Sequence, residues 1–476
     1  MNTEAECAMD REVLIRQITD IVGKEHVVTE ENDLIAYIFN AGPKAQLAEF
    51  HSRHLPILAV QPETADQVSR ILRIANENRI PVIPRGQASG LAENTRIYLP
   101  DSIILSMMRF KKLEVDPETL MAVAGPGVVT SKIKDAAAKF GLLYPPDPAS
   151  FGYSTIGGNV ATDAGGLQCV KYGTTKSYVS GLEVVLASGE IIRTGGKCVK
   201  DVTGYNLKQL FIGSEGTLGV ITEVTLKLVP LPPAKKALLA VFGSIENAGA
   251  AVSKIMISGI VPSIMEFMDN TLIRAVEDLT KQGLPVDAGG MLLIEVDGDP
   301  EVLDRHAATI EKVCRDLGAI EIRIASTPEE INAVWEGRRV CLQALSRVSK
   351  YRMSGDPAAP INKLAEILHK LKELGELHNS KVAAYGHAGD GNIHPCFLYS
   401  NDEEYARACQ VKDAFYEYIL TIGGTASAEH GVGSEKIALM RKQLGETQFG
   451  IMRGLKKLMD PNGILNPGCL FGDDYE

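Results

Sequence analysis

Three blocks of glycine constrain the fold of this chain more than any other feature of its sequence. They read PRGQASG, IGGNVATDAGG and GSEGTLG, and all lie between residues 84 and 219. Glycine lets a backbone approach a ligand closely, and such loops present N–H groups to anions such as a pyrophosphate. One block alone is more often a set of tight turns in a β-rich fold. Three blocks in one region favour a large cofactor that carries phosphate.

The common nucleotide-binding motifs do not account for these blocks. No G-x-G-x-x-G follows a predicted strand, and no G-x-x-x-x-G-K-S/T occurs in the chain. A Rossmann site for a nicotinamide and a P-loop are therefore poorly supported. The cofactor site is expected to be of another type.

Length and charge narrow the classes of protein further. A chain of 476 residues is too long for one core, so we expect two or three domains. A net charge of −11 without a long basic run argues against a nucleic-acid surface. The start lacks the pattern of a secretory signal, and no apolar run approaches about 18 residues. We therefore expect neither a signal peptide nor a transmembrane segment.

The cysteines indicate the cellular compartment in which we expect the protein. The chain has 8 cysteines and no C-x-x-C pair, which is typical of reduced thiols in a cytoplasmic protein. Iron–sulfur clusters usually draw several closely spaced cysteines, so this chain is expected to carry none.

The first third of the chain reads as an α/β unit behind a polar, mostly helical extension over residues 1–50. We predict a strand at Leu55–Val60, a helix that begins after Thr64, and a strand at Pro81–Pro84. Thr64 and Gln67 have the spacing of a capping box. The sequence therefore predicts a βαβ unit that ends in a glycine loop.

The middle of the chain predicts a hairpin and then a second domain. Leu182–Ala187 and Glu190–Thr194 flank a Ser188-Gly189 turn, and the proline-rich stretch Pro230–Pro233 is a plausible boundary. Beyond it, strand-like and helical stretches alternate, which predicts an α+β domain with an antiparallel sheet.

The stretch YGHAGDGNIHP predicts a second hairpin, with Asp390 and Gly391 as its turn. This register places His387 opposite His394, with Cβ atoms roughly 4.5–5.5 Å apart, so the two imidazoles can bind one metal ion. Tyr385, Asn392 and Cys396 fall on the same face. The alternative is a pair of exposed or hydrogen-bonded histidines beside a simple turn.

A third ligand is available in ASAEHGVGSEKI. Glu429 and His430 are adjacent, so their side chains point apart and only one of them is expected to bind the ion. Glu429 as the ligand leaves His430 available as a base. Two histidines and a carboxylate suit Zn, Fe, Mn or Co with positions left open for a substrate. The alternative is a solvated loop.

Five motifs carry a family resemblance: STIGGNVATDAGG, IGSEGTLGVITEVTLKL, GHAGDGNIHP, AEHGVGSEK and DPNGILNPG. Together they resemble the FAD-linked D-2-hydroxyacid dehydrogenases, which have the vanillyl-alcohol-oxidase flavoprotein fold. The glycolate oxidase large subunit, D-lactate dehydrogenases and D-2-hydroxyglutarate dehydrogenase are the most similar members. The resemblance covers residues from about 50 to 471.

The resemblance implies an α+β architecture in four parts. After the N-terminal extension, residues 51–232 would form a PCMH-type FAD-binding domain of two subdomains that meet near residue 145. Residues 233–425 would form the cap domain that holds the substrate, with its antiparallel sheet and helices. Residues 426–476 would be a helical segment that returns to the flavin.

The resemblance also assigns cofactor residues. The family's pyrophosphate loop reads RGxGTGLxGG, whereas this chain reads RGQASGLAENT, with Glu93 and Asn94 in place of the later glycines. The loop residues would be Arg85, Gly86, Gln87, Ala88, Ser89, Gly90 and Leu91. The remaining FAD contacts would be Asp147, Thr155, Gly158, Asn159, Ala161, Gly165, Gly216, Val220, Ile221 and Asn466.

The implied reaction is the oxidation of a D-2-hydroxy acid, with D-lactate as the leading substrate. The resemblance makes His387, His394 and Glu429 the ligands of a divalent metal (Zn, Fe or Mn) and His430 the active-site base. Arg338 would hold the substrate carboxylate bidentately, with Lys350 in a similar role. A hydride would pass from the substrate to flavin N5. Cys396 stands where 2-hydroxyglutarate dehydrogenases have an asparagine, which favours a small acid.

An electron acceptor must then be a separate molecule. The resemblance favours a partner protein, either an electron-transfer flavoprotein or an iron–sulfur subunit, over a quinone-linked acceptor. Three alternatives stay open: glycolate or D-2-hydroxyglutarate as the substrate, a flavin subunit that only passes electrons, and a metal hydrolase without flavin.

Overall fold

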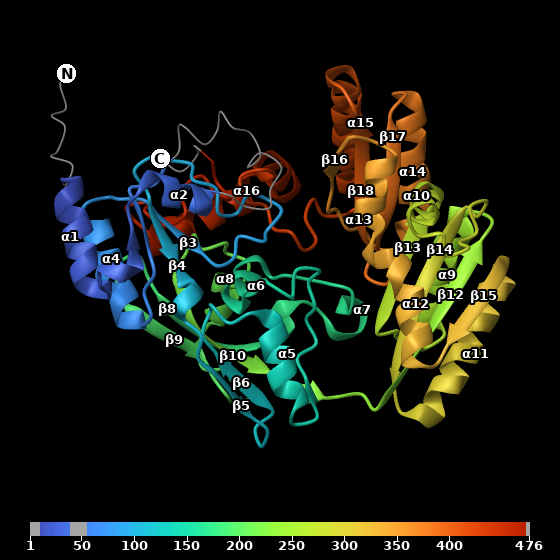
Figure 1. Ribbon diagram of the computed structural model, residues 1–476, viewed down its shortest axis with the longest axis horizontal. Coiled ribbons are helices and arrows are strands. Elements are labelled where there is room, and N and C mark those ends of the chain that lie inside the picture. Colours follow the sequence, from blue (N-terminus) through green and yellow to red (C-terminus); the bar gives the residue numbers. More distant parts are fainter. Residues whose placement is uncertain (1–9, 39–54, 473–476) are drawn as a thin grey trace. The chain divides into compact units, whose positions relative to one another are not determined.

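The computed structural model describes residues 10–38 and 55–472, which divide into two units (Figure 1). Unit 1 comes from residues 1–164, 174–231 and 429–476. Unit 2 comes from residues 165–173 and 232–428. The chain thus leaves unit 1, builds unit 2 and returns.

A four-stranded sheet of unit 1 contains the predicted βαβ unit. Its strand order is β1-β2-β4-β3, and β2, β4 and β3 are parallel. The Thr64 side chain accepts from the Gln67 N–H at 3.2 Å and starts α4. Strand β4 lies between the two strands of the predicted unit. The bounds are β1 (Val27–Val28), β2 (Leu58–Val60), α4 (Ala65–Glu77), β3 (Val82–Arg85) and β4 (Ile103–Ser106).

The residues before this βαβ unit take part in its sheet and core. Strand β1 pairs antiparallel with β2, and α1 (Arg11–Val22) buries Leu14 and Ile18 in the same core as α4. A second helix, α2 (Glu31–Ile38), packs on the sheet's other side through Leu34. Residues 1–9 and 39–54 of the expected extension lie outside the described residues.

A second sheet of unit 1 is antiparallel throughout, in the order β5-β6-β10-β8-β9. It confirms the predicted hairpin, because β8 and β9 flank a turn in which the Leu186 N–H donates to the Glu190 carbonyl at 2.9 Å. Strand β5 pairs with β6 and β6 pairs with β10, so strands from both sides of residue 145 share this sheet. The bounds are β5 (Leu113–Asp116), β6 (Met121–Ala124), β8 (Val179–Val185), β9 (Ile191–Gly195) and β10 (Val220–Lys227).

Shorter elements and one long helix complete unit 1. Strands β7 and β11 form a small pair, and α16 kinks at Gly445. The bounds are α5 (Thr130–Ala138), β7 (Leu142–Leu143), α6 (Ile156–Thr162), α8 (Lys208–Phe211), β11 (Val229–Pro230) and α16 (Ile437–Met459).

Unit 2 is built on a seven-stranded sheet in the order β15-β12-β14-β13-β17-β18-β16. All of its pairs are antiparallel, which confirms the predicted sheet type. The bounds are β12 (Ala234–Phe242), β13 (Ile264–Asp269), β14 (Gly290–Gly298), β15 (Ala319–Ala325), β16 (Tyr351–Ser354), β17 (Lys381–His387) and β18 (Asn392–Tyr399).

Helices cover both faces of this sheet (Figure 1). One face packs on α9 (Ile245–Ile257), α11 (Pro300–Asp316), α14 (Leu364–Leu377) and α15 (Asp402–Thr421). The other packs on α10 (Asn270–Thr280), α12 (Pro328–Arg339) and α13 (Cys341–Ala344). Alternate residues of each strand enter the two cores, as the period of a strand requires. The short helix α7 (Cys169–Tyr172) joins unit 2 through Tyr172, whose hydroxyl donates to Asp297 at 2.6 Å.

Candidate active site

The three glycine blocks lie side by side, and all of them belong to unit 1 except the end of the second, Gly165 and Gly166. A Cβ atom at Gly86 would lie 2.3 Å from Thr155 Oγ1, so the first block passes against the residue that precedes α6. The Glu215 N–H, in the third block, donates to the Ala161 carbonyl in the second at 2.8 Å. The three blocks therefore lie close enough together for one large ligand to contact all of them.

Asn466 links these blocks to the C-terminal segment. Its backbone N–H donates to the Val82 carbonyl at 2.8 Å, next to the first block. Its side-chain Nδ2 donates to the carbonyls of Asn94 and Glu215 at 2.8 and 2.7 Å. The resemblance implies that Asn466 lies near the flavin. In the structure this residue is buried where the first and third blocks meet.

The loop predicted to bind the pyrophosphate has left-handed residues at two positions of the family's glycines. Ala88 has a φ of +51° and Glu93 a φ of +57°, at two positions where the family pattern has glycine. A left-handed backbone costs a residue with a Cβ roughly 1–2 kcal/mol. Contacts to the Glu93 carboxylate oppose that cost, since it accepts from Arg96 and from the Ser434 hydroxyl, both at 3.3 Å. Ala88 and Glu93 therefore have the left-handed backbone that favours the glycines of the family pattern.

Buried oxygens in this region suit FAD as the ligand. Thr155 Oγ1, Asn94 Oδ1 and Asn466 Oδ1 are buried and have no hydrogen-bond partner among the described residues. Buried polar atoms in proteins nearly always have a partner. A Cβ at Gly90 would approach Asn94 Oδ1 to 2.5 Å, so the loop has no room for a side chain there. Hydroxyl, N–H and phosphate groups of FAD would provide the missing partners.

Other predicted FAD residues have structural partners of their own. Asn159 Nδ2 donates to Thr130 Oγ1 at 2.6 Å, and Val220 packs in the hydrophobic core beside α4. Gly216 lies against Pro84, and Gly165 groups with unit 2. Burial lowers the pKa of Arg85 to about 10. Of the remaining predicted residues, Ile221 is buried, Asp147, Ser89 and Ala161 are half-buried, and Gly158, Gln87 and Leu91 are exposed.

The hairpin of unit 2 differs in register from the predicted one. Strands β17 and β18 pair His387 with Asn392 and Tyr385 with His394, and residues 388–391 form the turn. The predicted pairing of His387 with His394 is therefore wrong. The shift is two residues, and since the strand period is two, each side chain keeps its predicted face.

Contacts to distant parts of unit 2 explain the longer turn. The Gly389 N–H donates to the Met265 carbonyl at 3.2 Å, and the Ala359 N–H donates to the Gly391 carbonyl at 3.1 Å. These bonds satisfy turn groups that a two-residue turn would pair within the hairpin. The Asp390-Gly391 pattern alone does not contain that information.

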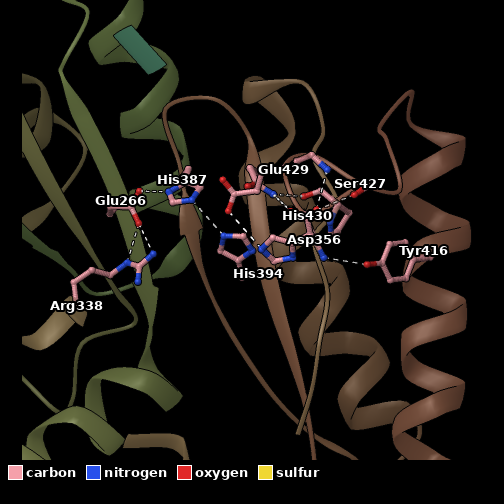
Figure 2. A network of polar contacts seen from close by, with 12 residues as sticks. Glu266, Arg338, Asp356, His387, His394, Tyr416, Ser427, Glu429 and His430 are labelled. Carbon is pink, nitrogen blue, oxygen red and sulfur yellow. Dashed lines mark hydrogen bonds and ion pairs between the residues drawn. The ribbon is translucent and has the colours of Figure 1, made fainter. Parts of the chain in front are cut away.

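Figure 2 shows the polar network around the two histidines. His387 Nε2 and His394 Nε2 lie 3.3 Å apart, and both residues are buried. On the other side of its ring, His387 Nδ1 lies 2.5 Å from Glu266 Oε1. Tyr385 packs on the His394 ring at 5.0 Å between centroids. The two imidazoles therefore direct one nitrogen each toward a common point.

Asp356 holds the loop that leads to the predicted carboxylate ligand. Its carboxylate accepts from the Asn392 amide, the Ser427 hydroxyl and the Ala428 N–H at 3.0–3.1 Å. Glu429 follows Ala428 directly, and His430 Nε2 lies 3.6 Å from Glu429 Oε1. Since the chain is anchored at Asp356, these two residues stay close to that carboxylate.

The donor atoms fit a divalent metal. Atoms of Asp356, His394, Glu429 and His430 lie within 4.8 Å of one another. Two nitrogens bound to one tetrahedral Zn²⁺ at about 2.0–2.1 Å lie roughly 3.3–3.4 Å apart, which matches His387 and His394. Of the three predicted ligands, His394 and Glu429 belong to this group, whereas His387 lies outside it and is linked to it through His394. The hydrogen bonds of Asp356 give it a scaffold role.

The two predicted substrate-binding cations lie in different surroundings. Arg338 Nε and Nη2 contact Glu266 Oε2 at 2.8 and 2.7 Å, and its guanidinium lies 4.6 Å from the Tyr385 ring centroid. The predicted bidentate contact between the Arg338 guanidinium and a substrate carboxylate would need those nitrogens. Lys350 is exposed, and its ammonium lies over the neighbouring Tyr351 ring at 5.0 Å. The structure does not bring Lys350 into the histidine network.

Sequence reasoning missed Glu266 and Asp356. Glu266 is a carboxylate in the middle of the apolar strand IMEFMD, which is itself a signal because buried charges need partners. Asp356 lies directly before Pro357 in a proline-rich loop, and the sequence there carries no comparable signal.

Solved structures place this architecture among flavoprotein folds. The chain is similar to p-cresol methylhydroxylase with substrate bound, at a TM-score of 0.78 and 19% identity, over 98% of this chain and 97% of that one. It is also similar to a 4-ethylphenol oxidase from Gulosibacter chungangensis, at a TM-score of 0.76 and 17% identity, with both chains fully covered. These similarities define the fold class and confirm the expected one.

Sequence comparison gives the family. Residues 56–195 match an FAD binding domain, and residues 231–470 match the C-terminal domain of FAD linked oxidases. The chain belongs to the FAD-linked oxidases, and it is an FAD-dependent oxidoreductase. Glycolate oxidase subunit GlcD of Bacillus subtilis is 39% identical over 96% of each chain. A D-lactate dehydrogenase of Anaerostipes hadrus is 36% identical over 87% of this chain and 89% of its own.

None of the described helices is both long and apolar enough to cross a membrane.

Proposed function

We propose that this protein oxidises a D-2-hydroxy acid, with D-lactate as the leading substrate. The observation that carries the proposal is the buried histidine pair, His387 and His394, with His430 beside it in an FAD-linked oxidase. A family member that only passed electrons would not need metal-binding donors and a base close together. The relatives named as glycolate oxidase subunit and D-lactate dehydrogenase act on acids of this class.

His387, His394 and Glu429 would hold a divalent metal, which acidifies a bound hydroxyl as it acidifies water. When bound in unit 1, FAD would supply an acceptor for the hydride equivalent of the substrate carbon. The role of His430 is to take the hydroxyl proton on its imidazole. General-base catalysis of this kind is worth roughly 10²–10⁴ in rate.

In this proposal Arg338 binds the substrate carboxylate through fewer nitrogens than the resemblance implies. Its contacts to Glu266 use Nε and Nη2, which leaves Nη1 as the nitrogen for a substrate carboxylate. One charge-assisted hydrogen bond would replace the predicted pair. Lys350 would need to turn away from Tyr351 to take part.

The substrate is proposed to be small because the same sheet face carries a buried thiol. Cys396 pairs with Ala383 beside Tyr385 and is fully buried. A thiol is a weak hydrogen-bond donor, so it would recognise a second carboxylate poorly. Glycolate is the main alternative to D-lactate, and D-2-hydroxyglutarate is disfavoured.

We also propose a partner protein as the electron acceptor, either an electron-transfer flavoprotein or an iron–sulfur subunit. Family analogy and the absence of a Rossmann motif in the sequence support this choice. The cysteines within the described residues are free thiols, which supports a cytoplasmic site of action. Rapid reduction of NAD⁺ by the purified chain with D-lactate would contradict the partner proposal.

A substrate panel tests the proposed function. Initial rates are measured with an artificial dye as the electron acceptor and with D-lactate, L-lactate, glycolate or D-2-hydroxyglutarate as the substrate. We expect the highest kcat/KM with D-lactate and none with L-lactate. A preference for glycolate would replace the substrate and keep the reaction. No rate with any of the four would overturn the proposal.

A further inference from the structure

We propose that Glu266 is a positioning residue for the metal ligand His387, and that Arg338 holds Glu266 in place. The proposal rests on the metal site of the proposed function and deepens it. It gives Arg338 a role that does not involve the substrate.

The sheet itself brings the glutamate to the histidine. Strands β13 and β17 are antiparallel neighbours, and their register pairs Glu266 directly with His387. Directly opposed residues point to the same face with Cβ atoms roughly 4.5–5.5 Å apart. Glu266 Oε1 consequently reaches His387 Nδ1 at 2.5 Å. The contact is built into the register and does not depend on a loop.

The two oxygens of Glu266 face different partners (Figure 2). Oε1 contacts the histidine, while Oε2 contacts Arg338 Nε at 2.8 Å and Nη2 at 2.7 Å. The Glu266 side chain is fully buried, and that of Arg338 is 13% exposed. A buried carboxylate without a counter-charge is strongly destabilising. Arg338 provides the counter-charge that Glu266 needs. The Tyr385 ring supports the guanidinium from one side.

This arrangement determines which His387 nitrogen faces the metal site. With Nδ1 donating to the carboxylate, the lone pair of a neutral imidazole lies on Nε2. Nε2 is the atom that lies 3.3 Å from His394 Nε2. A carboxylate behind a ligating histidine fixes the orientation of the ring and raises its strength as a ligand. Loss of such a partner typically costs 10–100-fold in metal affinity.

The competing explanation is that Glu266 and Arg338 form a structural ion pair with no effect on the metal. Glu295 provides a matched control. It lies on the neighbouring strand β14 opposite Ile264, so it shares the sheet face of Glu266. It is also buried, but it contacts Lys235 and Trp335 and not the histidines. Glu295→Gln therefore makes the same chemical change on the same face without touching a ligand.

The test measures Zn²⁺ affinity on the flavin-loaded protein. Wild type, Glu266→Gln and Glu295→Gln are loaded with Zn²⁺ and titrated with a competing chelator, and bound zinc is counted per bound flavin. Flavin content reports the integrity of unit 1 independently of activity. We expect Glu266→Gln to lose zinc at a free chelator concentration about 10–100-fold lower than wild type does. The zinc affinity of Glu295→Gln should equal that of wild type.

Other results would overturn the inference in distinguishable ways. Equal zinc affinity in wild type and Glu266→Gln removes the role of Glu266 and leaves the metal site intact. Equal losses in both variants indicate a general effect of buried charge. Wild type that binds no zinc overturns the metal site of the proposed function along with the inference.

Glu266→Asp is a second variant in case Glu266→Gln fails to fold. It keeps the charge opposite Arg338 and shortens the reach to His387 by one methylene. We expect reduced zinc affinity with flavin content unchanged. Wild-type zinc affinity in this variant would overturn the inference.

Discussion

At the scale of single residues, His430 carries the sharpest functional expectation. Its imidazole lies in the group of donors that includes His394 and Glu429, and it is assigned the substrate proton. We predict that His430→Ala lowers the rate of flavin reduction roughly 10²–10⁴-fold. Stopped-flow absorbance after anaerobic mixing with substrate measures that rate. Flavin and metal contents equal to those of wild type would show that only the base was removed, and an unchanged rate would contradict the role.

Ala88 gives a prediction about stability. Its φ of +51° strains a residue that has a Cβ, so Ala88→Gly should stabilise unit 1 by up to about 1 kcal/mol. Ala92, four residues later, is fully buried and has no positive φ, so Ala92→Gly should destabilise by a similar amount. Thermal unfolding of both variants with FAD bound checks the opposite signs. Destabilisation in both variants would mean that the loop is not strained.

At the scale of elements, the β17–β18 hairpin positions the two histidines. Gly391 in its turn has a φ of +79°, and a Cβ there would lie 2.0 Å from the Ala359 carbonyl oxygen. Gly423 has the same φ but open space around its Cβ. Gly423→Ala should therefore cost only the backbone strain, roughly 1–2 kcal/mol. Gly391→Ala should add a steric cost of about 1–3 kcal/mol and move the histidines.

Melting temperature and zinc affinity separate these two effects. We expect both variants to lower the melting temperature and only Gly391→Ala to weaken zinc binding. Equal zinc affinity in the two variants would contradict the idea that the turn positions the ligands.

The same hairpin illustrates what the sequence can predict. Alternation along the strands placed His387 and His394 on one face, and that face is correct. The register was not predictable, because Met265 and Ala359 bond to the turn from distant parts of the chain. Glu266 was missed for the same reason, since its partner His387 lies 121 residues away. Local elements with capping or turn signals, such as α4 and the β8–β9 hairpin, agree with their predictions.

At the scale of the whole molecule, a change among the glycine blocks of unit 1 should leave the histidine pair of unit 2 undisturbed. Lys456 is buried in unit 1, where it pairs with Asp460 and donates to the carbonyls of Thr217 and Leu465 at 2.9 and 2.8 Å. It thereby fixes the third glycine block against the segment that leads to Asn466. Lys456→Met would leave Asp460 buried without its counter-charge, at a cost of about 3–5 kcal/mol.

We predict that Lys456→Met loses FAD on dilution while zinc affinity stays at the wild-type value, because His387 and His394 lie in unit 2 and Asp356 anchors the loop that leads to Glu429. Lys457→Met changes the exposed neighbouring residue and should have neither effect. Bound flavin and bound zinc are measured on the same samples. Parallel loss of both groups would mean that the units do not behave independently.

The contents of the two units depend on contacts between distant parts of the chain. The glycine blocks meet largely in unit 1, and His387 and His394 lie in unit 2. Residues 165–173 nevertheless group with unit 2, because Lys171 and Tyr172 bond to Asp297 on β14. No local pattern in that stretch indicates a contact with a strand so far along the chain.

The measurement that tests the central claim most directly is an anaerobic absorbance spectrum of the purified protein before and after addition of D-lactate. We predict a bound flavin whose absorbance bleaches with D-lactate and does not change with L-lactate. That result would establish the cofactor, the reaction and the stereochemistry together. A protein without flavin absorbance, or a flavin that stays oxidised with D-lactate, glycolate and D-2-hydroxyglutarate alike, would contradict the account.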